Sequence, residues 1–302
     1  MIVVTAPTGT IGRQVVEHIL RTSEPARLIA RDPSKLPPAV RARFEVVQGS
    51  HCHPDVLDRA FAGADAVFWL VPPDPGAASV DAAYLDFTRP AVGALERHRV
   101  KRVVGISALG LGTPWADRAG LVTASLKMDE LLAAGSAAYR AVANPSFMDN
   151  LLRQLDAIRN QGVFYLPIDG DLKQPSACSR DIAEVAARWL LDPSWSGSGR
   201  VPVLGPEDLS YNDMARTMSE VLGRPVRFQR ISGDAFKARL LERGMSEAMA
   251  QANVEMWNAY DHGLDLGERR TSEATTPTTF RQWCEEVLGP RLAATAAAPK
   301  GG

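Results

Sequence analysis

The chain has 302 residues, of which 45% are hydrophobic and 23% charged, and its formal net charge at pH 7 is -1. This composition is ordinary for a globular protein, and the near-zero charge gives no electrostatic basis for binding nucleic acid or an anionic membrane surface. Three widely spaced cysteines do not make a disulfide framework, and no apolar run has the length of a membrane span. We therefore expect a cytoplasmic protein with one large α/β unit or two lobes.

The N-terminus predicts a β-strand, a tight turn and the start of a helix. Residues 2–4 are β-branched and suit a buried parallel strand. Gly9 and Gly12 leave room for a pyrophosphate and for close packing of the helix on the strand, and the helix N-terminus attracts phosphate. Ala6 stands where glycine usually opens this turn, so we expect it to avoid a positive φ. The predicted cofactor contacts in this segment are Thr5, Ala6, Thr8, Gly9, Thr10, Ile11 and Gly12.

A second predicted strand, over residues 28–30, is followed by Arg31, about 20 residues beyond the turn. An acidic residue here would bind the ribose 2′-hydroxyl of NAD(H), whereas a guanidinium can hold the 2′-phosphate of NADP(H). Lys35 adds a second positive charge nearby. The alternative is a surface ion pair between Arg31 and the adjacent Asp32. The spacing favours NADP(H) as the cofactor.

The rest of the N-terminal half alternates between the two kinds of element. Predicted helices at 54–62, 84–98 and 122–134 separate predicted strands at 44–49, 66–71, 102–107 and 139–144. This succession predicts an α/β fold, a Rossmann-type doubly wound parallel sheet with helices on both faces. Ligands bind beyond the carboxyl ends of such strands. Further predicted cofactor contacts at these ends are Gly49, Val71, Pro72, Pro73, Ser107, Asn144, Pro145, Ser146 and Phe147.

The second half is less regular and predicts a smaller C-terminal α+β lobe for substrate. Helices are expected at 179–191, 211–222, 233–259 and 279–288, and strands near 164–171, at 200–204 and at 226–231. We assign residues 1–155 to an NADP-binding Rossmann domain, to which residues 176–204 return. Residues 156–292 form the substrate lobe, and residues 293–302 form a disordered tail.

Several motifs, in the same order along the chain, resemble NmrA-like proteins. They are the N-terminal turn and residues 28–36, 71–73, 144–150, 203–207, 220–226 and 276–280. This family of atypical short-chain dehydrogenases includes quinone oxidoreductases, azoreductase-like enzymes and redox-sensing regulators. The chain departs from the family pattern at Ala6, at Ser50, where an aspartate is common near the adenine, and at Asn144, where many members have arginine. The resemblance implies an NADP(H)-binding protein with a cofactor site reshaped at these positions.

Two residues are candidates for catalysis. Classical short-chain dehydrogenases place a tyrosine four residues before a lysine. None of the six lysines here has a tyrosine at that position, and the residue four positions before Lys127 is Thr123. Lys127 matches a lysine that several NmrA-like proteins place near the nicotinamide; the alternative is a surface lysine paired with Glu130. Ser107 ends a predicted strand as the superfamily's catalytic serine does, and the alternative is an ordinary turn serine.

Two further features have simpler interpretations. The segment His51-Cys52-His53 lacks other ligands at suitable spacing, so we expect a polar loop and no metal site. Five large apolar residues are candidates for a pocket over the nicotinamide, although core packing explains any one of them. They are Trp115, Phe147, Met148, Trp257 and Tyr260.

These observations predict an NADP(H)-dependent reductase that passes hydride to a small apolar, conjugated acceptor such as a quinone or enone. A quinone suits the missing tyrosine, because its reduced form is a stabilised anion that water can protonate. A non-catalytic NADP(H) sensor with a protein partner fits the missing tyrosine equally well. A biosynthetic isomerase or cyclase on the same fold is a third alternative, and a homodimer is left open.

Overall fold

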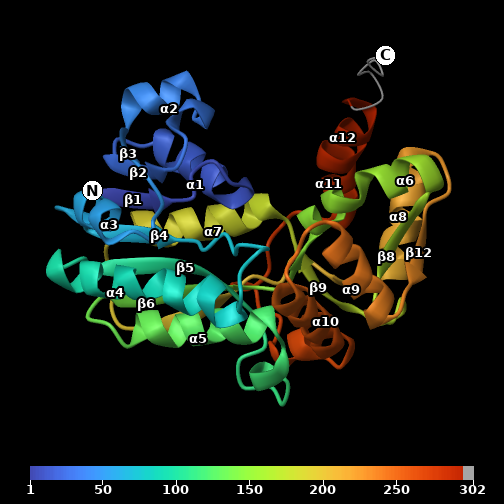
Figure 1. Cartoon of the computed structure of the whole chain (residues 1–302). Helices are drawn as coiled ribbons and strands as arrows, with labels where there is room; N and C mark the ends of the chain where they lie inside the picture. Colours follow the sequence, from blue (N-terminus) through green and yellow to red (C-terminus); the bar gives the residue numbers. More distant parts are fainter. Residues whose placement is uncertain (295–302) are drawn as a thin grey trace.

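The computed structural model describes residues 1–294, and its centre is a seven-stranded parallel sheet (Figure 1). The strand order is β10-β6-β5-β4-β1-β2-β3. The strands are β1 (Ile2–Thr5), β2 (Ala26–Ala30), β3 (Glu45–Gln48), β4 (Ala66–Trp69), β5 (Arg102–Ala108), β6 (Ala138–Asn144) and β10 (Gly199–Pro202). Because β1 neighbours both β2 and β4, the chain reverses its direction of winding there. The prediction of a Rossmann-type doubly wound sheet is confirmed.

Helices cover both faces of this sheet. On one face, α1 (Thr10–Leu20) packs against α2 (Pro38–Arg43) and α7 (Ser179–Leu191); on the other, α4 (Phe87–Arg97) packs against α3 (Pro54–Phe61) and α5 (Leu121–Ala133). The strands alternate accordingly: Val4 lies in the core under α1, and Val3 lies in the core under α3 and α4. A π-helical turn, Ala82–Asp86, precedes α4.

A smaller α+β lobe lies at one end of the sheet (right side of Figure 1). Its strands are β8 (Val163–Leu166), paired in parallel with β12 (Arg227–Arg230), and β7 (Ser146–Phe147), β9 (Gln174–Ala177) and β11 (Asp208–Leu209), which form a second small sheet. Its helices are α6 (Leu155–Gln161), α8 (Tyr211–Leu222), α9 (Gly233–Glu242), α10 (Glu247–Asp261), α11 (Phe280–Trp283) and α12 (Gly289–Ala294). Within residues 1–294, every helix is too short or too polar to cross a membrane.

The C-terminal segment differs from expectation. The last helical region continues through a π-helical turn, Cys284–Leu288, into α12, which includes residues 293 and 294 that were expected in a disordered tail. The reason is that Leu292 is buried in the core of the smaller lobe. Residues 295–302 of the expected tail lie outside the described residues. The return of the chain to the main sheet occurs through α7 and β10, while the division into two domains stays a prediction.

Candidate cofactor and substrate site

The turn between β1 and α1 brings backbone and helix into close contact. A Cβ on Gly12 would lie 2.1 Å from the Ala6 carbonyl oxygen, so only glycine fits here. Gly9 donates its N–H to the same carbonyl at 3.0 Å. Ala6 adopts φ 47°, and the expectation of a negative φ was wrong, because the chain must bend sharply to receive the Gly9 amide. That left-handed conformation costs a residue with a Cβ about 1–2 kcal/mol.

The start of α1 is open to an anion. Gly9 caps the helix without a side chain, and the first turn holds no acidic residue. Thr8, Gly9 and Thr10 are all exposed. The unpaired N–H groups and the positive end of the helix dipole are therefore available to a phosphate.

Two residues of the predicted cofactor set are structural in their side chains. Thr5 is buried; its hydroxyl donates to the Phe68 carbonyl at 3.0 Å and accepts the Leu70 N–H at 2.9 Å. These bonds fasten the end of β1 to the end of β4. Ile11 is buried in the core under α1. Only the backbone of these two residues is left to face a ligand.

Arg31 lies exposed at the end of β2, and in residues 1–294 no carboxylate pairs with it. The Asp32 carboxylate instead accepts the Ser34 N–H at 3.0 Å and the Ser34 hydroxyl at 2.6 Å, which lowers the pKa of Asp32. These bonds cap a short 3₁₀ helix, Pro33–Lys35, on which Lys35 is also exposed. In the described chain, Arg31 and Asp32 therefore do not form the ion pair considered as the alternative.

Gly49 and His51 follow β3, at the same end of the sheet as Arg31, because β2 and β3 are parallel neighbours. A Cβ on Gly49 would lie 2.4 Å from a Val56 methyl group. His51 is 4% exposed and lies edge-on to the rings of Trp69 and Phe87, with its Nε2 3.0 Å from the Leu70 carbonyl oxygen. Burial lowers the pKa of His51 to about 4, so the ring is neutral near pH 7 and donates to that carbonyl. Across residues 1–294, no three His, Cys, Asp or Glu side chains are grouped as metal ligands.

Ser107 is the next-to-last residue of β5, and its hydroxyl is directed at α5. The hydroxyl donates to the Asp129 carboxylate, which also accepts from the Tyr139 hydroxyl at 2.6 Å and from Arg200 at 3.1 Å. Burial raises the pKa of Asp129, and the three donors oppose that effect. A serine has one hydroxyl hydrogen, so Ser107 must break this bond before it donates to a substrate.

Of the other two candidates on these elements, Asn144 is bonded to Ser107, and Lys127 is not. Lys127 is exposed on α5, and the described chain shows no ion pair between it and Glu130. Asn144 is buried at the end of β6, and its amide donates to the carbonyls of Ser107 and Val142 at 3.0 and 2.7 Å. Its Oδ1 atom has no hydrogen-bond partner in the described chain. Asn144 thus joins the ends of β5 and β6 and keeps one acceptor unused.

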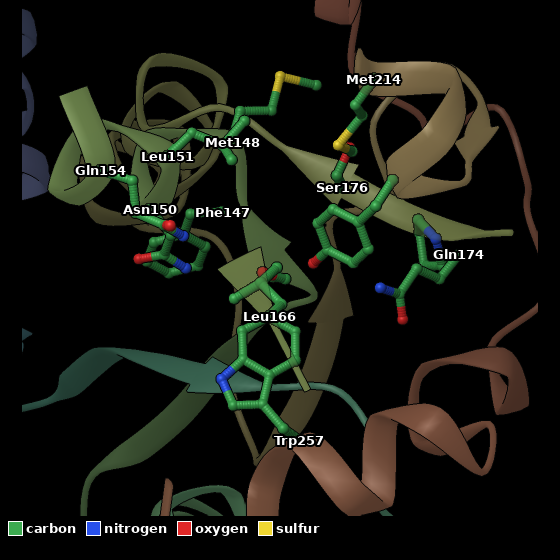
Figure 2. Close-up of a pocket in the computed structure, with 13 residues that line it drawn as sticks. Phe147, Met148, Asn150, Leu151, Gln154, Leu166, Gln174, Ser176, Met214 and Trp257 are labelled. Carbon is green, nitrogen blue, oxygen red and sulfur yellow. The ribbon is translucent and has the colours of Figure 1, made fainter. Parts of the chain in front are cut away.

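Beyond β6, the chain forms a largely apolar pocket (Figure 2). The empty space at this pocket, counted together with the open solvent at its mouth, is about 410 Å³. Trp257 of α10 lies opposite Met148 and Met214 (Figure 2). The lining residues are Ser146, Phe147, Met148, Asn150, Leu151, Gln154, Leu166, Gln174, Pro175, Ser176, Tyr211, Met214 and Trp257.

Three of the five apolar candidates, Phe147, Met148 and Trp257, line this pocket. Trp115 does not, and packs against His262 at 4.6 Å between ring centroids. Tyr260 lies buried against Trp257 at 5.4 Å. Ser146 and Phe147, which were expected at the cofactor, connect the two regions, since they follow β6 directly and also border the pocket.

Several polar side chains around the pocket went unrecognised in the sequence. Gln174 and Ser176 lie on β9, whose Gln-Pro-Ser-Ala sequence carries no β-branched or aromatic residue to indicate a strand. Asp265 follows α10 in a short 3₁₀ helix, Leu264–Gly267, where nothing in the local pattern predicts burial. Each of these three residues is buried and has at least one polar atom without a partner in the described chain.

The loop after β4 is bonded to the smaller lobe. Ser246 at the start of α10 donates its N–H to the Pro75 carbonyl at 2.9 Å and its hydroxyl to the Ala77 carbonyl at 2.6 Å. The same hydroxyl accepts the Met249 N–H and caps α10. The loop that contains Pro72 and Pro73 is thereby joined to the helix that carries Trp257.

Comparison with known proteins agrees with this geometry. Residues 7–193 match a family model for NAD(P)H binding, and residues 133–284 match the NmrA-like family model. The chain is 30% identical over 257 residues to an NAD(P)H azoreductase from Xenophilus azovorans, covering 85% of this chain and 86% of that protein. It is 32% identical over 296 residues to a (4-alkanoyl-5-oxo-2,5-dihydrofuran-3-yl)methyl phosphate reductase from Streptomyces griseus, covering 95% and 97%.

Among solved structures, a similar fold occurs in an NADPH-dependent quinone oxidoreductase from Escherichia coli complexed with NADPH. The TM-score is 0.76 at 22% identity, and the match covers 95% of this chain and all of that one. Together, the sheet, the glycine turn, the two family models and the matches along almost the whole chain lead to one assignment. The chain belongs to the NAD(P)H-binding, NmrA-like family of oxidoreductases.

Proposed function

We propose that this protein transfers a hydride from NADPH to a small, flat, conjugated acceptor such as a quinone or an enone, without a Tyr-x-x-x-Lys pair. The observation that carries the proposal is the apolar pocket beside Ser146 and Phe147, directly beyond the end of β6. In a doubly wound sheet the cofactor lies across the strand ends, so a ligand in this pocket would lie next to the reactive end of that cofactor.

The residues of the cofactor site fit a dinucleotide. Gly12 lets the start of α1 pack directly against the turn after β1, and the start of α1 offers unpaired amides. Arg31 supports the choice of NADP(H), because its guanidinium meets no carboxylate in the described chain and suits a 2′-phosphate. When bound, the reduced nicotinamide supplies the hydride, and the protein binds and orients both reactants.

The relatives support the choice of acceptor class. By their names, one relative reduces an azo compound and the other a (4-alkanoyl-5-oxo-2,5-dihydrofuran-3-yl)methyl phosphate, which carries carbonyl groups. The pocket of this chain presents aromatic and thioether side chains, which suit a flat apolar molecule. We assign Lys127 a contact with the ribose or the nicotinamide. Ser107 is the second candidate, and its role requires release of its hydroxyl from Asp129.

Two linked measurements test the proposal. Fluorescence titration of the purified protein with NADPH and with NADH gives both dissociation constants, and absorbance then follows NADPH oxidation with quinones, enones and aldehydes. We expect tighter binding of NADPH and oxidation that depends on an acceptor. Tight binding without turnover would favour the redox sensor instead, and absence of binding would refute the cofactor assignment.

A further inference from the structure

Polar side chains of the small sheet form one wall of the acceptor pocket. Ser146 on β7 and both Gln174 and Ser176 on β9 line the pocket. Ser146 and Ser176 are register partners in neighbouring parallel strands, so their side chains lie on the same face of the sheet. Gln174 lies two residues before Ser176 and shares that face. We call Gln174 and Ser176 the β9 pair.

The β9 pair has hydrogen-bonding capacity that the protein itself does not use. Gln174 is 3% exposed and Ser176 is 4% exposed. The Gln174 Oε1 atom and the Ser176 hydroxyl have no hydrogen-bond partner within residues 1–294. Buried polar atoms are nearly always hydrogen-bonded, because an unpaired polar atom away from water costs free energy. Two such atoms on one wall of a pocket indicate that a ligand supplies their partners.

A second glutamine of the pocket has a structural role and provides a contrast. Gln154 lies on the other side of the pocket from Gln174 (Figure 2). Its Nε2 donates to the Tyr165 carbonyl oxygen at 3.1 Å, and its Oε1 accepts the Tyr165 N–H at 2.9 Å. The amide of Gln154 is therefore used within the protein, whereas the Gln174 Oε1 atom is left for a ligand.

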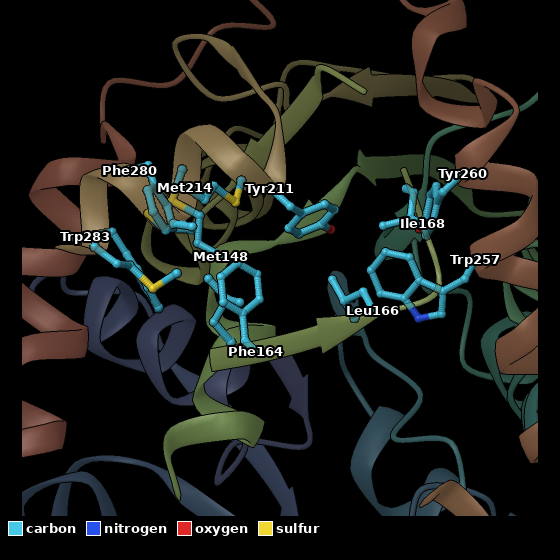
Figure 3. Packing of buried hydrophobic residues seen from close by; sticks show 14 of the residues in the cluster. Met148, Phe164, Leu166, Ile168, Tyr211, Met214, Trp257, Tyr260, Phe280 and Trp283 are labelled. Carbon is cyan, nitrogen blue, oxygen red and sulfur yellow. The ribbon is translucent and has the colours of Figure 1, made fainter. Parts of the chain in front are cut away.

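The rest of the lining is largely aromatic, aliphatic or thioether. The Tyr211 ring stacks on Phe228 at 5.4 Å and lies edge-on to Trp257 at 6.2 Å between centroids. Figure 3 shows this ring between Met214 and Trp257. In the described chain, no Asp, Glu, Lys, Arg or His lines the pocket. A charged ligand would lose its hydration here without gaining a counter-ion, so the pocket suits an uncharged, flat ring.

We propose that the β9 pair selects uncharged acceptors that carry a hydroxyl or N–H group beside the reducible system; this rests on the proposed function. The Gln174 Oε1 atom can only accept a hydrogen bond, so its partner must be a donor on the ligand. The Ser176 hydroxyl can donate as well as accept, so it can bind the oxygen of the same group. Residues two apart in a strand are about 7 Å apart, a spacing that allows one hydroxyl to bond to both side chains.

The selectivity comes from a penalty on the wrong ligand. An acceptor with a methyl group in place of the hydroxyl excludes water from the β9 pair and leaves both buried atoms unpaired. A site that hydrogen-bonds a substrate hydroxyl rejects the analogue without it more strongly than an apolar pocket rejects a change of size. We expect the hydroxyl to strengthen binding by at least about 10-fold.

The test compares two uncharged naphthoquinones that differ by one hydroxyl, one with a methyl and the other with a hydroxymethyl substituent. Calorimetry of the full chain saturated with NADP⁺ gives both dissociation constants, and no hydride can pass to the quinone in this complex. The wild type should prefer the hydroxymethyl quinone by at least about 10-fold, and Gln174→Met should bring this ratio close to one. Gln154→Met, the matched control, should affect both quinones alike and so keep the wild-type ratio.

Ser176→Ala supplies a second variant whose folding is not in question. Its hydroxyl has no partner in the described chain, so no internal bond is lost and Tm should stay at the wild-type value. The preference for the hydroxymethyl quinone should nevertheless decrease, because the ligand oxygen loses its donor. A structural role for Ser176 would instead lower Tm and leave the preference unchanged.

Steady-state kinetics with NADPH then separate this inference from the proposed function. The ratio of kcat/KM for the two quinones should follow the ratio of dissociation constants, and comparison of wild type with variant cancels the difference in reactivity between the quinones. Equal dissociation constants in the wild type, or a preference that neither β9 variant changes, overturns this inference alone. Absence of NADPH oxidation with either quinone overturns the proposed function, while the dissociation constants still decide whether the β9 pair recognises the hydroxyl.

Discussion

The buried ring of His51 makes the stability of the protein depend on pH. The folded protein holds the pKa of His51 at about 4, against 6.5 for a histidine in water, and the chief cause is loss of hydration. At pH values between 4 and 6.5, His51 binds a proton in the unfolded chain but stays neutral in the folded protein. The neutral His51 ring therefore costs the folded protein no stability above pH 6.5. The free energy of unfolding decreases as the pH falls from 6.5 toward 4. The difference of about 2.5 pH units corresponds to about 3 kcal/mol.

Urea unfolding at pH 7.5 and at pH 4.5 measures this loss. We compare the wild type with His51→Gln, which keeps an N–H donor for the Leu70 carbonyl but has no titrating ring. Carboxylates that titrate in the same range affect both proteins equally, so the difference between them isolates His51. His53→Gln, which removes an exposed ring two residues away, is the matched control. If the wild type and His51→Gln lose the same free energy of unfolding between the two pH values, the argument from burial is refuted.

Three further predictions concern the cofactor site. Arg31→Ala raises the dissociation constant of NADPH by about 10- to 100-fold, the value of a hydrogen-bonded charge pair, and equal losses for NADH in titration would contradict it. Gly12→Ala places a Cβ 2.1 Å from the Ala6 carbonyl oxygen, so cofactor binding is lost and calorimetry shows a lower Tm; unchanged binding would refute the close approach. Lys127→Met lowers kcat/KM for NADPH while Glu130→Gln does not, and equal steady-state kinetics in both would show that Lys127 is only a surface residue.

The main sheet was predictable because its signals are local. The strands of the first half are short apolar runs ended by proline, glycine or a polar residue, and the helices between them carry one apolar face. Gly12 could be interpreted for the same reason, since its neighbours fix the turn. The conformation of Ala6 was not predictable from its residue type, because the bond from Gly9 and the position of α1 outweigh the preference of alanine.

The pocket was predictable only in part, because it is formed by segments distant in the chain. Phe147 and Met148 follow a recognisable strand, but Gln174 and Ser176 come to line the pocket beside Tyr211 only after the smaller lobe folds. Their polarity suggests exposed loops when each segment is considered alone. Similarly, the Ser107 hydroxyl donates a hydrogen bond to Asp129, 22 residues later in the chain, and no pattern in the sequence indicates that bond.

The two bonds from Ser246 to the loop after β4 have a consequence for the sequence of events in turnover. Val71, Pro72 and Pro73 of this loop are predicted cofactor contacts, and the helix that Ser246 caps carries Trp257, which lines the pocket. We expect a nucleotide that contacts the loop to restrain that helix as well, and so to complete the pocket before the second substrate enters. This connection favours a compulsory order of addition, in which the nucleotide is the first reactant to arrive and the last product to leave.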